Sequence, residues 1–223
     1  MTGKQQQPRH TAYAIMMLLY AVFALTVDSL STNHTRWGID WSLFYWRLKN
    51  GFEMSTAILW LGIPVLLMWR DLDLRVFTFG RWKKTDAWLL IALMLAGACG
   101  VYLIKFIPAL NQYYQPHSHL SSAMKWSYAI SNLIWLSSWL IGWEFLHRVF
   151  LMQYLQAMLG KIGPCFIPAF EFLFHLQKSI PEALGMLLLS IVLTYWSYKR
   201  KNVLLPLLAH LSIEITLLSY LIV

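Results

Sequence analysis

The chain has 223 residues, of which 58% are hydrophobic, 16% aromatic and only 13% charged. This composition cannot cover the surface of an ordinary water-soluble domain, so it excludes that class and indicates a polytopic membrane protein. The formal net charge of +8 does not indicate a nucleic-acid partner, because the basic residues gather in the connections between apolar runs.

Seven apolar runs are long enough, or nearly so, to cross about 30 Å of hydrocarbon, which takes roughly 20 helical residues. They cover residues 12–31, 55–69, 87–107, 127–156, 162–177, 183–198 and 203–223. The second run is short and the fifth contains Pro164 and Pro168, so each is expected to be tilted, kinked or partly inserted. The sequence therefore predicts an all-α membrane helix bundle of about seven segments, six to eight, in a single domain over residues 1–223.

The basic residues predict the orientation of the bundle. If the runs alternate in direction, the side that holds the N-terminus carries most of the Lys and Arg side chains outside the runs. These are Lys4, Arg9, Arg70, Arg75, Arg81, Lys83, Lys84, Lys161, Lys199, Arg200 and Lys201. The excess predicts a cytoplasmic N-terminus in a multi-pass protein of a bacterial or archaeal-type cell membrane, with contacts to anionic lipid headgroups.

Other residues receive structural interpretations. Tryptophans near the run ends are expected to anchor the helices at the membrane interface; examples are Trp37, Trp41, Trp46, Trp69, Trp82 and Trp88. Cys99 and Cys165 lack metal-binding spacing and are expected to be packing residues without a disulfide. Asp28 is expected to lie at a span end or in a helix contact, and residues 111–125 are expected to form a loop.

The C-terminal part of the chain places three carboxylate and histidine pairs inside apolar sequence. They are Glu144 with His147, Glu171 with His175, and His210 with Glu214. A charged side chain at the centre of a bilayer costs about 2.5–3.5 kcal/mol even on lenient insertion scales, so such a cluster indicates a functional site. Arg148 lies one helical turn after Glu144 and can neutralise it, which by itself would be a structural ion pair.

The pairs converge if the helices bundle with their polar faces inward. A carboxylate and a histidine can then take a proton from water, and a second histidine can donate to the oxyanion that forms on a peptide carbonyl. Alternatively, His175, His210 and Glu144 are ligands for zinc or another divalent metal. No HExxH sequence supports the metal version, so no cofactor is predicted. Straight crossings would place His175 at a different depth, and segment 162–177 is therefore expected to enter obliquely from the cytoplasmic side.

From residue 137 to 223 the chain resembles the CPBP family, which includes type II CAAX prenyl endopeptidases, bacteriocin-processing membrane proteases and lysostaphin-resistance-like proteins. The first family motif is Glu-Glu-x-x-x-Arg, and residues 143–148 match it except that Trp143 replaces the first Glu. The second motif, Phe-x-x-x-His, ends on His175, with Glu171 in place of Phe.

The third family motif, His-x-x-x-Asn or Asp, is met by His210 and Glu214. A branch of the family resembles this chain more closely, because it has Trp-Glu in the first motif and a Lys and a Glu after the second. Lys178 and Glu182 match that feature.

The resemblance implies that Glu144 and His175 activate water and that His210 and Glu214 stabilise the oxyanion. It implies supporting roles for Arg148, Glu171 and Glu182. In an alternative assignment Glu144 only holds Arg148, and Glu171 or Glu182 supplies the base. An ionised Glu214 would repel an oxyanion, so this residue would have to act in its protonated form.

The function implied by the resemblance is an intramembrane endopeptidase that hydrolyses a peptide bond of a membrane-anchored or membrane-proximal substrate. The expected partners are that peptide or protein substrate and the lipid bilayer, with no nucleic acid. The substitutions at the motif positions favour an alternative, a catalytically inactive relative that acts as a membrane scaffold or chaperone. A third alternative, an ion or proton pathway, needs a continuous polar track, and the sequence shows a cluster instead.

Overall fold

The computed structural model describes residues 7–32 and 46–223. Within these ranges the protein is built of helices, and the only β-pairing is an isolated antiparallel bridge between Arg47 and Glu53. The α-helices are α1 (Gln7–Thr32), α3 (Met54–Ala57), α4 (Ile63–Leu67), α5 (Lys84–Leu103), α6 (Pro108–Tyr113), α7 (Ser122–Phe145), α8 (Met152–Leu159), α9 (Ile167–His175), α10 (Ile180–Arg200) and α11 (Leu204–Ile222). Two π-helical turns, η2 (Ile58–Gly62) and η6 (Leu146–Leu151), and four 3-10 turns, η3 (Leu74–Phe77), η4 (Phe79–Arg81), η5 (Ile104–Phe106) and η7 (Gly160–Phe166), connect them.

The described helices confirm the predicted all-α membrane bundle. Five stretches are long and apolar enough to cross a membrane, namely Thr11–Leu30, Lys84–Phe106, Ser122–His175, Ile180–Arg200 and Leu204–Ile222. The predicted run 55–69 appears as a shorter apolar helix, Met54–Leu67, which contains the π-helical turn η2. The predicted run 162–177 is not a long helix, because residues 160–166 form the turn η7 and only Ile167–His175 is α-helical.

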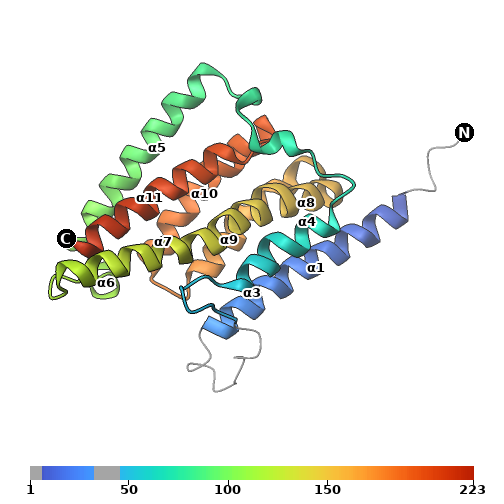
Figure 1. The fold of residues 1–223 in the computed structure, drawn as a ribbon. Helices are drawn as coiled ribbons and strands as arrows, with labels where there is room; N and C mark the ends of the chain where they lie inside the picture. Colours follow the sequence, from blue (N-terminus) through green and yellow to red (C-terminus); the bar gives the residue numbers. More distant parts are fainter. Residues whose placement is uncertain (1–6, 33–45) are drawn as a thin grey trace, which may run out of the picture.

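Long-range hydrogen bonds show which helix ends meet (Figure 1). At one end, Lys201 Nζ donates to Gln156 Oε1 at 3.0 Å, and Asn202 Nδ2 donates to the carbonyl of Thr78 at 2.7 Å. We call this end, formed by residues 69–83, 160–166 and 201–203, the Lys201 end. At the other, the amide of His117 donates to the carbonyl of Leu221 at 2.7 Å, and we call this end, formed by residues 107–121, 176–179 and 223, the Tyr114 end. Successive helices therefore run in opposite directions between the two ends.

The chain turns back sharply between α8 and α9. Gly160 has a φ of +63°, a backbone conformation that glycine adopts without steric cost. Gly163 lies so close to α8 that a Cβ there would be 2.1 Å from the carbonyl oxygen of Leu155. The nine-residue helix α9 is about 14 Å long, or roughly half of the hydrocarbon thickness. It is therefore too short to be a full crossing by itself.

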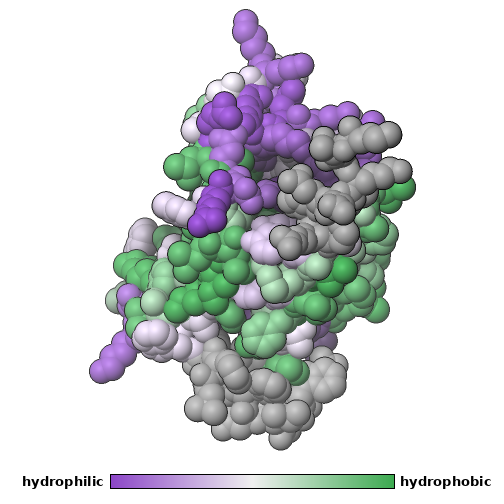
Figure 2. All heavy atoms as spheres, turned by 90° about the vertical axis from the view of Figure 1, so that its right-hand side faces the viewer, coloured by the Kyte–Doolittle hydropathy of each residue, from purple (hydrophilic) through white to green (hydrophobic). Residues whose placement is uncertain are grey.

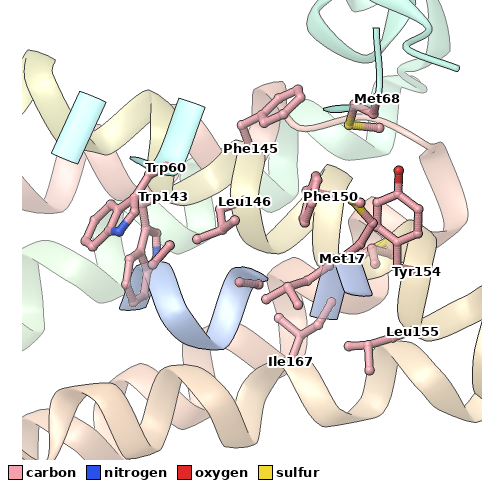
Figure 3. Close-up of a cluster of buried hydrophobic side chains, with 14 of the residues drawn as sticks. Met17, Trp60, Met68, Trp143, Phe145, Leu146, Phe150, Tyr154, Leu155 and Ile167 are labelled. Carbon is pink, nitrogen blue, oxygen red and sulfur yellow. The ribbon is translucent and has the colours of Figure 1, made fainter. Parts of the chain in front are cut away.

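The largest core cluster lies between α1, η2 and the continuous helix formed by α7, η6 and α8 (Figure 3). Its fully buried members include Met17, Trp143, Phe150 and Ile167, which come from four different segments. Elsewhere large apolar side chains are exposed on the outer surface, as Leu188 is at 67%. Figure 2 shows apolar residues across the middle of one face and hydrophilic residues gathered at its top. This distribution is the one expected of helices surrounded by lipid.

Several sequence interpretations change in detail. The predicted loop 111–125 contains the end of α6 and the start of α7, whose first turn is capped because Ser121 Oγ accepts from the amide of Met124 at 3.4 Å. Cys99 and Cys165 are free thiols as expected, but both are exposed, so the prediction that they pack inside is wrong. Asp28 is half-buried and accepts a hydrogen bond from Thr56 Oγ1 at 3.1 Å, which is a helix contact between α1 and α3.

The expected tryptophan anchors fall into three groups. Trp37 and Trp41 lie outside the described residues. Trp46, Trp69 and Trp88 are 57%, 71% and 72% exposed, as interfacial anchors would be. Trp82 is partly buried instead, and its indole donates to Asn202 Oδ1 at 3.3 Å.

Candidate active site

Glu144 lies in the last turn of α7 and is fully buried. Its Oε1 lies 2.8 Å from Nδ1 of His210, which α11 brings from the far end of the sequence. Its Oε2 has no hydrogen-bond partner in the described part of the chain, and the nearest cation, Arg148 Nε, lies 3.7 Å away. One carboxylate oxygen is therefore engaged by a histidine while the other remains able to accept a proton or a hydrogen bond.

Arg148 is held by Glu171 rather than by Glu144. The guanidinium donates to both oxygens of Glu171, from Nη1 at 2.5 Å and from Nη2 at 2.9 Å. Nη2 also lies 3.4 Å from Ser190 Oγ on α10. A bidentate pair of this kind is the strongest geometry available to an arginine and a carboxylate. Glu171 is thus the hydrogen-bonded partner of Arg148, and Glu144 is a second, more distant ion-pair partner at 3.7 Å.

The histidines of the first two predicted pairs do not bond the carboxylates next to them in sequence. Nδ1 of His147 bonds to the carbonyl of Trp143 at 2.9 Å, and Nδ1 of His175 bonds to the carbonyl of Glu171 at 2.8 Å. A main-chain carbonyl only accepts hydrogen bonds, so Nδ1 is the donor in both rings. In a neutral ring Nε2 then carries the lone pair. His175 is thus oriented to accept a proton at Nε2.

Glu214 is the second acidic neighbour of His210. Its Oε1 lies 3.7 Å from Nε2 of His210, one helical turn away on α11. This distance is within the range of an ion pair but too long for a hydrogen bond. His210 is therefore flanked by two carboxylates, with Glu144 as the close partner.

Trp143 is the centre of a cluster of aromatic rings that includes two of the histidines. Trp143 is 2% exposed, and its ring packs against those of Trp60, Phe174, His147 and His175 at centroid distances of 5.2, 5.0, 4.1 and 5.5 Å. Gly142 permits this contact, because a Cβ there would lie 2.9 Å from the Cβ of Trp60. The contact with His175 places the end of α9 at the level of Trp143 and Glu144. The conflict of depth expected from straight crossings is thereby removed.

Lys178, which lies between α9 and α10, links this cluster to the Tyr114 end. Its ammonium lies 2.7 Å from Glu182 Oε1 and 3.4 Å from the hydroxyl of Tyr114. Burial alone would lower the pKa of Lys178, but the charge of Glu182, with smaller contributions from Tyr114 and Glu214, raises that pKa above its usual value. Burial raises the pKa of Tyr114 as well. Lys178 therefore stays protonated.

An open groove of about 530 Å³ lies beside Lys178, between α6 and the start of α10. Lys178 forms part of its wall, together with Ala109, Tyr113 and Ile180. The groove therefore lies next to the Lys178–Glu182 ion pair.

The sequence identified most of the residues that the structure brings together. Glu144, Arg148, Glu171 and His210 are buried in one cluster, and His175 and Glu214 border it. Ser190 and Tyr114 were missed, because neither stands at a helical spacing from another charged residue. Glu182 pairs with Lys178 at 2.7 Å.

Among the described residues, no three His, Cys, Asp or Glu side chains are grouped so that they would hold a metal ion. This statement covers the alternative ligand set of His175, His210 and Glu144.

Residues 126–216 match the family model described as "Type II CAAX prenyl endopeptidase Rce1-like". The match confirms the family that the motifs predicted, and it contains all three of them. No curated protein matches the chain, and no solved structure matches it.

Proposed function

We infer that this protein, whose residues 126–216 belong to the Rce1-like family of type II CAAX prenyl endopeptidases, is an intramembrane endopeptidase. Its substrate would be a membrane-anchored or membrane-proximal peptide segment. The carrying observation is the buried hydrogen bond of 2.8 Å between Glu144 and His210. It forms while Arg148 is occupied by Glu171, so a carboxylate oxygen of Glu144 stays available for chemistry.

In the proposed reaction Glu144 Oε2 and Nε2 of His175 orient one water molecule and take its proton. The hydroxide adds to the peptide carbonyl carbon, and the C–N bond then breaks as a proton passes to the leaving nitrogen. His210 can carry protons on both nitrogens between its two carboxylates, so its Nε2–H is a donor toward the oxyanion. Glu214 would orient that ring and balance its charge. This role removes the need for a protonated Glu214 beside the oxyanion.

The departures from the family motifs are compatible with activity because they compensate each other. Trp143 removes an acid from the first motif, and Glu171 adds one in the second motif. The added carboxylate supplies the bidentate partner of Arg148, and both residues of the exchange are buried. The chain therefore has as many acids in these two motifs as the family pattern has.

Mapping of protein termini in membranes from expressing cells tests this function. Membrane proteins from cells that express the wild type or Glu144→Gln are compared by mass spectrometry of their N- and C-terminal peptides. The proposal expects new termini that appear only with the wild type. Asp71→Asn is the matched control, since it makes the same chemical change at an exposed carboxylate and should leave those termini in place.

The scaffold or chaperone alternative is favoured by one observation, the presence of Trp143 where the family has an acid. It would be supported if wild type and Glu144→Gln give the same termini while both co-purify with the same membrane protein. A metal-dependent reaction is distinguished by activity in a chelator. Loss of cleavage that zinc restores would replace the water activation by Glu144 and His175 with activation by a bound metal.

A further inference from the structure

Three polar residues of α10 form a buried row toward the Lys201 end. Ser190, Thr194 and Ser197 follow each other at spacings of four and three, so they share one face of the helix. They are 0%, 4% and 1% exposed. Because α10 is otherwise an apolar span, this row needs a physical reason.

Contacts at both ends of the row show what it faces. Ser190 Oγ lies 3.4 Å from Arg148 at its inner end, and Lys201, the first residue after α10, bonds to Gln156 at its outer end. On the opposite side, Arg148, Met152 and Gln156 stand four residues apart along η6 and α8. The row therefore runs from the Arg148–Glu171 pair, which Ser190 contacts, toward the charged surface of the Lys201 end, over about 16 Å.

The hydroxyls in the middle of this row differ from the other hydroxyls of the membrane helices. Ser137 and Ser138 on α7, and Ser212, Thr216 and Ser219 on α11, all donate to a carbonyl three or four residues earlier. This is the usual way in which a helix satisfies such groups. Thr194 Oγ1 and Ser197 Oγ have no hydrogen-bond partner among the described residues, although both are buried.

Buried polar groups of proteins are almost always hydrogen-bonded, to protein atoms or to ordered water. Small molecules that both donate and accept hydrogen bonds would satisfy the two hydroxyls. Moving along the row, they would reach the guanidinium of Arg148. Water is the molecule of that size and chemistry.

We propose that the Ser190–Thr194–Ser197 face of α10 lines a narrow path that carries water from the Lys201 end to the Arg148–Glu171 pair and the adjacent Glu144. The need for such a path rests on the proposed function, because each hydrolysis consumes one water within an apolar bundle. The path itself is a property of α10 and is testable without a substrate.

The test uses single cysteines in the full chain, after Cys99→Ala and Cys165→Ala remove the two native thiols. Thr194→Cys and Ser197→Cys are compared with Leu193→Cys, which is buried on another face of α10, and with Val192→Cys, which is 38% exposed on the outer surface. The probe is methyl methanethiosulfonate, a small neutral reagent that reacts with the thiolate and therefore only where water reaches the sulfur. Rates are read from the mass of the intact protein in liposomes.

The proposal expects the cysteines at 194 and 197 to react at least about tenfold faster than those at 192 and 193. Equal and slow reaction of all four overturns it.

Each variant is first checked for the elution volume and unfolding temperature of the wild type. The double variant Ser197→Ala with Thr194→Val provides a second readout. That double variant should slow cleavage severalfold without moving the unfolding temperature. Fast labelling without any cleavage activity would keep the water path and reject the proposed function, so the two failures are distinguishable.

Discussion

At the scale of the residue, the buried charges choose partners on other helices in place of their neighbours in sequence. Glu144 and Arg148 are one turn apart, yet their closest approach is 3.7 Å, whereas Glu171 reaches the guanidinium with both oxygens. The planar guanidinium group of an arginine makes two strong hydrogen bonds with a carboxylate that approaches it from the side. A carboxylate on the same helix cannot reach that orientation as easily. The result is that Glu144 is released for His210.

This exchange predicts that Glu171 is the main stabiliser of the buried arginine. Replacing one partner of a buried ion pair leaves an uncompensated charge and costs about 3–5 kcal/mol. We therefore expect Glu171→Gln to lower the apparent unfolding temperature in detergent by roughly 10 °C. Glu182→Gln, which breaks the more exposed pair with Lys178, is the matched control and should cost about 1 kcal/mol or less. Equal stability of Glu171→Gln and wild type would show that Glu144 suffices as the counter-ion.

The site residues could be predicted from the sequence, but their pairing could not. Spacing identifies which side chains share a face of one helix, and Glu144, Glu171, His175 and His210, which it singled out, lie in one region of the structure. Which helix faces which is decided by tertiary packing, so the bonds from Glu144 to His210 and from Glu171 to Arg148 had no signal in the spacing. Ser190 was missed for the same reason, because it joins the cluster only through α10.

At the scale of the element, the short helix α9 determines whether the cluster forms. Its position depends on the turn at residues 160–166, where Gly163 packs directly against the backbone of α8. The sequence placed a helical segment at 162–177, whereas the helix begins at Ile167. Pro164 and the close contact of Gly163 give the preceding residues a 3-10 conformation. Such a boundary depends on a contact with another helix and cannot be derived from local composition.

Gly163→Ala is expected to disrupt this turn. Its Cβ would lie 2.1 Å from a backbone oxygen, so α9 must move away from α8, and Glu171 then leaves Arg148. We expect a loss of about 3 kcal/mol or more, measured as a lower unfolding temperature, together with loss of cleavage. In Gly185→Ala the added Cβ meets no atom within 4 Å, and helix propensity predicts a gain of about 0.5–1 kcal/mol. A Gly163→Ala protein as stable as Gly185→Ala would refute the role of the turn.

At the scale of the whole molecule, hydropathy predicted the fold class because five of the described stretches are long and apolar enough to cross a membrane. Met54–Leu67 is shorter than a typical span, and α9 covers only part of one. The runs 55–69 and 162–177 were expected to be irregular. The first contains the π-helical turn η2, and the second contains part of the 3-10 turn η7. What hydropathy cannot supply is the return of a half-length helix into the bundle, since this follows from packing against α8 and α10.

The two ends of the bundle are expected to lie on opposite sides of the membrane. The basic excess at the Lys201 end predicts that this end is cytoplasmic. In a background without native cysteines, Lys161→Cys and Lys201→Cys should react with an impermeant maleimide only after the cells are opened. Gln112→Cys, at the Tyr114 end, should react in intact cells. Reaction of all three in intact cells, or the reverse pattern, would contradict the proposed orientation.

The central claim is that Glu144 and His175 act together on one water molecule in the bundle formed by α7, α9 and α11. It is tested most directly by the turnover rate of purified protein in liposomes, on a peptide segment identified by the mapping of termini. Glu144→Gln and His175→Ala should each reduce kcat by about 100-fold or more in protein that remains folded, as shown by its elution volume and a cooperative unfolding transition. Retention of at least half of the wild-type rate in both variants would contradict the account.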